Sequence, residues 1–494
     1  MSNLNDKRYQ DFDIGDYVYF TRKFNAKDHK SFSQLSGDYN PLHFDKEYAK
    51  NSKFGEIILP MHLTTMPLSA IAGMMLPGHR SLYLSTNIKS IKPAHYDKDI
   101  TYSAKIIDKN DPHSLLIIRV LVFDGLDVLL DAHMTVQVRN DVNAIMAPDY
   151  KKTTLINKND KPTAFITGAS GDIGQSVAVR LSENGWNVIL HYSTDTKKIK
   201  EIESICMANG SEVETIKANL ENEDELNKVI SILKKRTDIV DMIHAACPKI
   251  DSPLNKLMTV NYVALQKMAE TVLPIMLLRQ YGRVTYIGST ATRYLIKGWE
   301  NYTASKSAAS NYVYQLNTLY EQYGVNFRVV APGYVKTKFS EQYRTNETPA
   351  ILPEHLAEEI VSGLRGAWSN SANHIQVEHH GTQIGNFNFH KIREFADDVQ
   401  AKEEALGVES VNHDNYKFDI EIEKLIREFI KIDPNIDMEN LGVDQISGWD
   451  SLRHIELIVY LEKELNIKFK SHEIEKTKAY TELVSLIKSK INNN

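Results

Sequence analysis

The sequence contains little of what marks secreted, metal-binding or nucleic-acid-binding proteins. Only two cysteines, Cys206 and Cys247, occur among 494 residues, too few for a disulfide framework, and no cluster has the spacing of zinc ligands. We therefore expect no metal site and a reducing compartment, the cytoplasm. A formal net charge of −6 gives no reason to expect nucleic-acid binding, because such proteins carry a basic patch or stripe.

Long apolar runs, internal repeats and low-complexity tracts are also missing. The charged start, MSNLNDKRYQDFDIGDYV, does not resemble a signal peptide. No later run reaches the roughly 18 apolar residues that span a bilayer. At about 150 residues per domain, the length predicts a multidomain protein of roughly three domains.

Residues 1–145 combine a loop bearing a carboxylate and an imidazole with one buried helix and several strands. Residues 26–36 favour a short helix, and the turn residues of SGDYNPLHFD then bring Asp38 and His43 close together. The uncharged run LPMHLTTMPLSAIAGMML is long enough for a buried helix, and TYSAKIID, SLLIIRVLVF and HMTVQV favour strands. This order predicts an α+β domain in which a sheet wraps around a helix.

A carboxylate and an imidazole within reach of one water can act as a general acid–base pair. The segment GDYNPLH resembles the signature of the MaoC-like (R)-specific enoyl hydratases, which have the hot-dog fold, and KPAHYDKD and Phe54-Gly55 follow at similar places. The resemblance implies that Asp38 and His43 are catalytic. Pro60-Met61 stands where the family has His-Gly, so Met61 would supply the N–H that polarises the thioester, and its side chain would reshape the acyl pocket. The alternative is that the loop is only a stable turn.

Residues 160–385 begin with a strand, a glycine turn, a helix and a second strand, namely TAFIT, TGASGDIG, QSVAVRLSENG and WNVILHY. This is a βαβ unit. Gly168, Gly171 and Gly174 allow the backbone to approach a pyrophosphate, and the helix that follows offers free N–H groups to it. The pattern predicts a Rossmann-type, doubly wound α/β domain that binds a dinucleotide.

Further along, the segment YTASK carries an acid–base pattern. Tyr302 and Lys306 lie four residues apart, on one face of a helix. The ammonium can favour the ionised phenol, and such a tyrosine can act as a general acid near neutral pH while Ser289 holds a carbonyl oxygen. Here the chain resembles the short-chain dehydrogenase/reductase family, which implies that these three residues are catalytic and that Asn261, in VNYVA, orders a proton-relay water. The alternative is a surface tyrosine beside a solvated lysine.

The same resemblance implies a set of cofactor contacts. They are Gly168, Ser170, Gly171, Ile173, Gly174, Tyr192, Asn219, Tyr302, Lys306, Pro332, Gly333 and Thr337. Several positions depart from the family pattern: Gly171-Asp172 replaces Arg-Gly, residues 244–247 read HAAC rather than NNAG, and Asn219 replaces an aspartate. Tyr192 stands where an NAD enzyme carries an acid for the ribose 2′-OH, which favours NADP(H) over NAD.

The C-terminal part combines a charged segment, residues 386–417, with a helical one, residues 418–494. The first predicts a linker. In the second, FDIEIEKLIREFI and DSLRHIELIVYLEKEL favour helices separated by a long loop. Asp450 can cap the later helix, leaving Ser451 where helix N–H groups favour a phosphodiester. This resembles an acyl carrier protein, an all-α helical bundle, and implies 4′-phosphopantetheine on Ser451; the alternative is an ordinary helix cap.

Together the three resemblances imply a multifunctional enzyme of fatty-acid or polyketide-like biosynthesis. The reductase would convert a 3-oxoacyl thioester to the (R)-3-hydroxyacyl form, the hot-dog domain would dehydrate or hydrate it, and the carrier would tether it. Expected partners are a phosphopantetheinyl transferase, a condensing enzyme and an acyl-loading enzyme, and a homodimer or homotetramer is expected.

Two other interpretations remain open. One is acyl-CoA β-oxidation, in which hydration is followed by oxidation with NAD. The other is a non-catalytic acyl-binding scaffold, if the departures from the family patterns mark lost sites. The carrier-like segment argues against the first, and the intact Asp38, His43, Ser289, Tyr302 and Lys306 argue against the second.

Overall fold

The computed structural model divides the chain into two compact units, Met1–His390 and Lys391–Asn494. It describes residues 7–139, 161–294, 296–343, 349–369 and 372–387 of the first unit, and residues 426–427, 429–430, 451–464, 469 and 479–491 of the second. The connector near residue 150, nearly all of the predicted linker and the predicted cap Asp450 lie outside the described residues. The domain boundaries given above therefore remain predictions.

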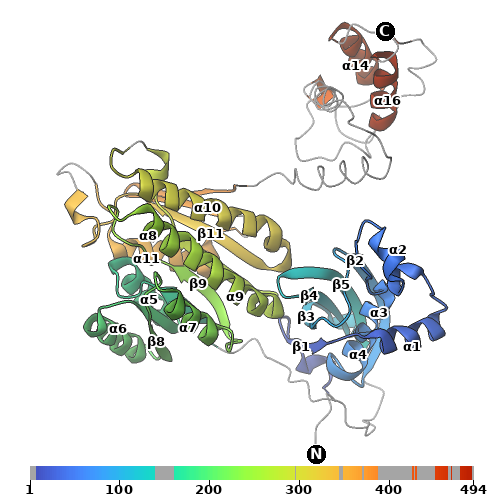
Figure 1. The fold of residues 1–494 in the computed structure, drawn as a ribbon, viewed down its shortest axis with the longest axis horizontal. Coiled ribbons are helices and arrows are strands. Elements are labelled where there is room, and N and C mark those ends of the chain that lie inside the picture. Colours follow the sequence, from blue (N-terminus) through green and yellow to red (C-terminus); the bar gives the residue numbers. More distant parts are fainter. Residues whose placement is uncertain are drawn as a thin grey trace, which may run out of the picture. The chain divides into compact units, whose positions relative to one another are not determined.

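The N-terminal part of the first unit is a five-stranded antiparallel sheet with the order β1-β3-β4-β5-β2. Its strands are β1 (Tyr17–Arg22), β2 (Ser81–Ser90), β3 (Ile100–Asn110), β4 (Leu115–Asp124) and β5 (Asp127–Val138). The helices and turns are η1 (Tyr9–Asp11), α1 (Ala26–Ser36), η2 (Pro41–His43), α2 (Lys46–Lys50), α3 (Met61–Thr65), α4 (Pro67–Ala70), η3 (Ile71–Met75) and η4 (Asp111–His113). Figure 1 shows the helices of this part in blue, beside the sheet.

The predicted buried helix is present as three consecutive segments, α3, α4 and η3. Pro67 takes the first position of α4, where the missing N–H of proline has no helical partner to lose. Leu63, Leu68 and Ile71 of this stretch join the inward-facing side chains of the strands in one core. The prediction of a sheet packed around a helix is confirmed.

The other face of this sheet is also covered. Leu121, Phe123 and Val128 belong to the hydrophobic core of the following part of the chain, and the Ser103 hydroxyl donates a hydrogen bond of 2.5 Å to the Leu278 carbonyl. Burial on both faces explains why β4 reads as the nearly continuous apolar run LLIIRVLVF rather than as a strict alternation.

The second part of the unit is an eight-stranded sheet with the order β13-β12-β11-β10-β9-β6-β7-β8. All neighbouring strands are parallel except β13, which is antiparallel to β12. The strands are β6 (Thr163–Thr167), β7 (Asn187–Tyr192), β8 (Val213–Lys217), β9 (Ile239–His244), β10 (Gly282–Ile287), β11 (Val325–Pro332), β12 (His374–Glu378) and β13 (Gly381–Gly385). The order reverses next to β6, so the sheet is doubly wound, as predicted.

Helices join these parallel strands. The α-helices are α5 (Asp172–Glu183), α6 (Thr196–Ala208), α7 (Glu223–Leu233), α8 (Leu254–Met258), α9 (Ala264–Arg279), α10 (Glu300–Tyr320) and α11 (Pro353–Ser362). Shorter turns are η5 (Thr259–Val263), η6 (Thr290–Arg293), η7 (Glu321–Tyr323), η8 (Glu341–Tyr343) and η9 (Gly363–Ala367).

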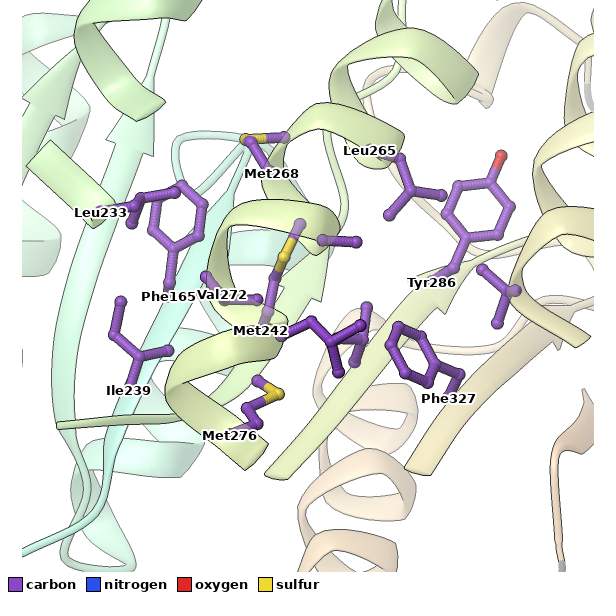
Figure 2. Close-up of a cluster of buried hydrophobic side chains, with 14 of the residues drawn as sticks. Phe165, Leu233, Ile239, Met242, Leu265, Met268, Val272, Met276, Tyr286 and Phe327 are labelled. Carbon is purple, nitrogen blue, oxygen red and sulfur yellow. The ribbon is translucent and has the colours of Figure 1, made fainter. Parts of the chain in front are cut away.

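Helix α9 lies against the centre of the sheet. Figure 2 shows Met268, Val272 and Met276 of this helix facing Phe165 and Met242 of the strands. These three helical residues follow a spacing of four, which places them on one face of the helix. Their burial fixes α9 against the central strands of the sheet, and the cavity described below opens at the carboxyl ends of those strands.

In the second unit the structure describes two longer helices, α14 (Ser451–Glu464) and α16 (Tyr480–Ile491), drawn in red in Figure 1. Leu457 and Leu461 of the first and Leu483 and Ile487 of the second are buried. Ser451 is the first residue of α14. The wider all-α carrier bundle remains a prediction.

Candidate active sites

A cavity of about 670 Å³ lies at the carboxyl ends of the parallel strands. This volume falls within the roughly 300–1,000 Å³ of small-molecule sites. The loops after β6, β9, β10 and β11 contribute to its wall, including Gly168, Ala246, Ser289 and Gly333. It is therefore at the switch point where doubly wound sheets bind ligands.

The cavity brings together Ser289, Tyr302 and Lys306. Ser289 follows β10, and Tyr302 and Lys306 lie on α10, which packs along β11. The Ser289 hydroxyl lies close enough to the Tyr302 phenol to lower its pKa. The Lys306 ammonium donates to the Ile287 carbonyl at 2.8 Å and lies 5.8 Å from the centre of the Tyr302 ring. Only 7% of Tyr302 and 3% of Lys306 is exposed, so the surface-tyrosine alternative does not describe this pair.

The electrostatics of this pair differ from the expectation that Lys306 favours the phenolate. Burial, and then the Coulombic interaction with Cys247, raise the pKa of Tyr302 well above its ordinary value, while the Ser289 hydroxyl lowers it less. Burial also lowers the pKa of Lys306. Because desolvation disfavours both charged forms, Tyr302 is a protonated phenol in this structure.

Asn261 lies behind the cavity rather than in its wall. It is completely buried in the π-helical turn η5, and its amide donates to the Ser305 hydroxyl at 2.9 Å. Its Oδ1 is buried without a partner among the described residues. Such an acceptor is normally satisfied by an ordered water. π-Helical turns of this kind are frequent at functional sites.

The glycine turn has the close packing that the sequence predicts. Gly168 has φ +68°, and a Cβ there would lie 2.8 Å from Ala246. A Cβ on Gly174 would lie 2.9 Å from the Gly168 carbonyl carbon. Helix α5 starts directly after Gly171, so its first N–H groups, which have no intrahelical partner, face the cavity.

All but one of the predicted cofactor residues line this cavity. The exception is Tyr192, which is buried, and its neighbours His191 and Ser193 form the wall instead. His191 donates from Nε2 to the Ala218 carbonyl at 3.0 Å, so its Nδ1 accepts from the Gly168 N–H at 3.3 Å. Burial lowers the pKa of His191 to about 4, and the neutral ring thereby fixes the glycine turn.

His244 performs a similar role where the family has an asparagine. It donates from Nε2 to the Val260 carbonyl at 3.0 Å, and its Nδ1 lies 2.9 Å from the Thr167 hydroxyl. Burial lowers the pKa of His244 to about 3. The neutral ring connects the ends of β6 and β9 to the turn that carries Asn261. Neither His191 nor His244 was predicted to act here, since a lone histidine in a strand carries no signal in the sequence.

A second candidate site lies on the loop after α1. His43 Nε2 is 4.0 Å from Asp38 Oδ2, and His43 Nδ1 lies 2.9 Å from the Ile58 carbonyl. Because a carbonyl only accepts, Nδ1 carries the proton and Nε2 is left free toward the carboxylate. The side chain of Asp38 is 37% exposed and that of His43 12%. Asp38 and His43 therefore face a common, solvent-accessible space.

Two residues that the sequence did not indicate complete this cluster. The Tyr96 hydroxyl donates to the His43 carbonyl at 2.9 Å, and the His29 ring lies 6.1 Å from that of His43 and 6.0 Å from that of Tyr96. Burial, and then Asp38, raise the pKa of Tyr96 to about 12. Burial, and then His43, lower the pKa of His29. Met61 is the first residue of α3 and is 40% exposed.

Two negative findings concern the described residues only. No cluster of three or more His, Cys, Asp or Glu side chains among them could hold a metal ion. Within the same part of the chain, no helix is both long enough and apolar enough to cross a membrane.

Comparison with family models matches residues 162–348 to the short chain dehydrogenase family and residues 12–101 to the MaoC like domain. The first match contains the cavity and the second contains Asp38 and His43. The first unit is thus a MaoC-like hot-dog domain followed by a Rossmann-type domain.

Among curated proteins, the chain is 29% identical over 233 residues to the 3-oxoacyl-[acyl-carrier-protein] reductase FabG of Buchnera aphidicola subsp. Schizaphis graminum, covering 44% of this chain and 94% of that protein. It is 31% identical over 192 residues to the protein of the same name from Buchnera aphidicola subsp. Acyrthosiphon pisum, covering 37% of this chain and 77% of that protein.

Among solved structures, a short-chain dehydrogenase from Sphingobium yanoikuyae in complex with NADPH has a TM-score of 0.40 at 20% identity, covering 51% of this chain and 98% of that one. The identity to the second Buchnera reductase, together with the match over residues 162–348, shows that the chain belongs to the short-chain dehydrogenase/reductase family.

Proposed function

We propose that the chain is a multifunctional acyl-thioester enzyme. Its central domain reduces a 3-oxoacyl thioester to the (R)-3-hydroxyacyl form with NADP(H), and its hot-dog domain dehydrates or hydrates that product. The observation that carries the proposal is the convergence of Ser289, Tyr302 and Lys306 in the cavity bounded by the glycine turn. The Buchnera relatives are named as 3-oxoacyl-[acyl-carrier-protein] reductases, which supports this choice of substrate.

The residues of the cavity fit a nicotinamide dinucleotide. The backbone around Gly168 and Gly174 is packed so closely that no side chain could stand there, and the free N–H groups at the start of α5 suit a pyrophosphate. When bound, the cofactor supplies the hydride. The end of β7 offers no carboxylate for a ribose 2′-OH, since Tyr192, Ser193 and Thr194 stand there, which favours NADP(H).

The protein's own groups would position and protonate the substrate. The Ser289 hydroxyl holds the carbonyl oxygen, and the Tyr302 phenol, kept protonated by its burial, donates a proton to that oxygen. Lys306, fixed by the Ile287 carbonyl, lies beneath the phenol and stabilises the negative charge that develops as the proton leaves. The unpaired Oδ1 of Asn261 suits a water that returns the proton.

In the hot-dog domain, His43 and Asp38 would act on one water. The proton on His43 Nδ1 is committed to the Ile58 carbonyl, so Nε2 is the nitrogen available to take or return a proton. Asp38, whose Oδ2 is 4.0 Å from Nε2, is close enough to contact the same water. The Met61 N–H, at the first position of α3, would polarise the thioester carbonyl.

We further propose that the C-terminal segment carries the acyl chain on 4′-phosphopantetheine attached to Ser451, the first residue of α14. A phosphopantetheinyl transferase would attach this group, and condensing and acyl-loading enzymes would act in trans. The proposed assembly is a homodimer or homotetramer located in the cytoplasm. A serine at a helix start, followed by a helix that buries Leu457 and Leu461, supports this assignment.

Intact-protein mass spectrometry tests the whole proposal. The protein is co-expressed with a phosphopantetheinyl transferase, loaded with a 3-oxoacyl group and treated with NADPH. We expect one phosphopantetheine per chain, a gain of two hydrogens on the acyl group, and then the loss of one water. A protein that no transferase modifies, but that oxidises (R)-3-hydroxyacyl-CoA efficiently with NAD, would instead be a catabolic enzyme. A protein with neither activity would be the scaffold.

A further inference from the structure

Asp172 stands where the family's glycine turn has its middle glycine, and it connects three parts of the cofactor cavity. It is the first residue of α5. Its Oδ1 accepts a hydrogen bond from the Lys198 ammonium, at the start of α6, at 2.8 Å. Its Oδ2 accepts one from the Lys338 backbone N–H, also at 2.8 Å. Lys338 belongs to the loop after β11, whose residues Thr337, Phe339 and Ser340 also line the cavity.

The part of the loop that Asp172 contacts is already rigid. Thr337 and Ser340 exchange side-chain to backbone hydrogen bonds, each of 3.2 Å, and their hydroxyls are 2.9 Å apart. Lys338 therefore lies in a closed turn, and we expect the residues of this turn to move together. We use "the 337–340 turn" for this segment.

The approach to the 337–340 turn is also fixed. Lys336 donates from its N–H to the Ile351 carbonyl, and Ile351 donates to the Tyr334 carbonyl, both at 2.8 Å. These bonds hold the base of the loop. The hydrogen bond from the Lys338 N–H to Asp172 is the one described link between the tip of the turn and the glycine turn.

The carboxylate is well suited to this link. Although burial alone would raise its pKa, the hydrogen bonds from Lys198 and from the Lys338 N–H bring the pKa of Asp172 below its ordinary value. Its side chain is 22% exposed, as is that of Lys198. The groups that face it are thus two cations and one N–H, and a hydrogen bond to an ionised, partly buried acceptor is stronger than a neutral one.

We propose that Asp172 is a latch: a positioning residue that holds the 337–340 turn across the cofactor cavity and slows release of the bound dinucleotide. The glycine turn and the loop after β11 both line one cavity, so a bond between them joins two parts of the wall that would enclose the dinucleotide. The identity of the ligand rests on the proposed function. The bond between the two walls does not.

Three variants separate the latch from the ion pair. Asp172→Ala removes both hydrogen bonds. Asp172→Asn removes the charge, but its amide oxygen can still accept from the Lys338 N–H. Lys198→Met removes the ion pair and leaves the bond to Lys338 intact, so it is the matched control for effects on α5 and α6.

Release of NADPH, followed by its fluorescence in a stopped-flow displacement experiment, is the first measurement. We expect Asp172→Ala to release the cofactor about tenfold faster, as for the loss of one hydrogen bond to a charged group. Asp172→Asn should be intermediate, and Lys198→Met should stay within about twofold of the parent. An unchanged release rate in Asp172→Ala, or an equal acceleration in Lys198→Met, would overturn the latch.

Limited trypsin digestion without cofactor gives a second measurement that needs no activity. Trypsin cleaves after Lys336 and Lys338, whose side chains are exposed, and opening of the turn would free the backbone around them to enter the protease. Cleavage there should accelerate in Asp172→Ala and not in Lys198→Met, with equal thermal unfolding temperatures showing that both variants are folded. If the parent binds no NADPH, the reductase proposal fails. If digestion does not distinguish the variants, the latch itself is wrong.

Discussion

Replacing Tyr302 with phenylalanine removes a single oxygen from the cofactor cavity. The ring keeps its edge-on contact with Trp299, whose centre is 5.8 Å away, and Lys306 keeps its bond to the Ile287 carbonyl. The variant should therefore fold and bind the cofactor as the parent does. What it lacks is the proton that the substrate oxygen must receive.

The expected loss can be stated from the chemistry. A positioned general acid contributes roughly 10² to 10⁴ in rate, which corresponds to about 3–5 kcal/mol in the activation barrier. Ser289 and the cofactor cavity remain, so the variant should keep some activity. We expect kcat for reduction to fall by at least about 100-fold while the Kd for NADPH changes little.

Tyr286→Phe is the matched control. Tyr286 is also fully buried. The Lys306 ammonium lies 4.8 Å from the centre of the Tyr286 ring. Its hydroxyl has no partner among the described residues, and it does not line the cavity. Removing an unpaired buried hydroxyl should leave stability equal or slightly higher, with reduction unchanged. The assignment of Tyr302 is refuted if Tyr302→Phe turns over within a few-fold of the parent, or if Tyr286→Phe loses as much.

The remaining predictions concern the other two sites. Asp38→Asn and His43→Ala should each abolish hydration of a crotonyl thioester, measured by its absorbance, while NADPH oxidation by the central domain persists; normal hydration by both would make the loop structural. Tyr96→Phe removes the hydrogen bond to the His43 carbonyl and should lower hydration by about tenfold or less, the loss of one neutral hydrogen bond; a complete loss would mean that Tyr96 itself transfers a proton. Ser451→Ala should leave turnover of acyl-CoA substrates unchanged yet prevent any gain of phosphopantetheine mass, and a variant that is still modified would place the attachment elsewhere.

Much of the central site could be predicted because its signals are local. The spacing of Gly168, Gly171 and Gly174 reflects the close approach of a helix to a strand, and four residues between Tyr302 and Lys306 is one helical turn. Such patterns involve residues that are close together in the sequence, so they can be recognised without the fold. The strands β3, β4 and β5 were likewise visible, because their apolar runs are buried by neighbouring elements.

Strand β2 shows why the remaining strands of the N-terminal sheet could not be predicted from the sequence. It lies at the edge of the sheet, most of its residues are exposed, and Leu82, Tyr83 and Leu84 follow one another without alternation. A strand exposed on both faces has no period of two to detect. The contact of His29 and Tyr96 with the candidate site was not predicted for a related reason. These two residues are 67 positions apart in the chain and meet only through the tertiary fold.

The pKa of Tyr302 shows a limit of a different kind. Helical spacing correctly placed an ammonium beside the phenol, but spacing carries no information about water. In the folded protein burial is the largest effect: it raises the pKa of Tyr302 and lowers the pKa of Lys306, because both charged forms lose their hydration. For a reductase this serves the chemistry, since the donor is needed in its protonated form.

Two departures from the family pattern, Asp172 and His244, can be understood through their contacts, together with those of His191. His191 accepts a hydrogen bond from the Gly168 N–H, His244 accepts one from the Thr167 hydroxyl, and each ring donates to a backbone carbonyl. These buried hydrogen bonds fix the ends of β6, β7 and β9. Asp172, in place of a glycine, adds a bond across the cavity. A site that had lost its function would be expected to leave such buried groups unpaired, at a cost of about 1–3 kcal/mol each. The polar atoms of all three side chains are instead paired, which argues against reading these residues as marks of a lost site.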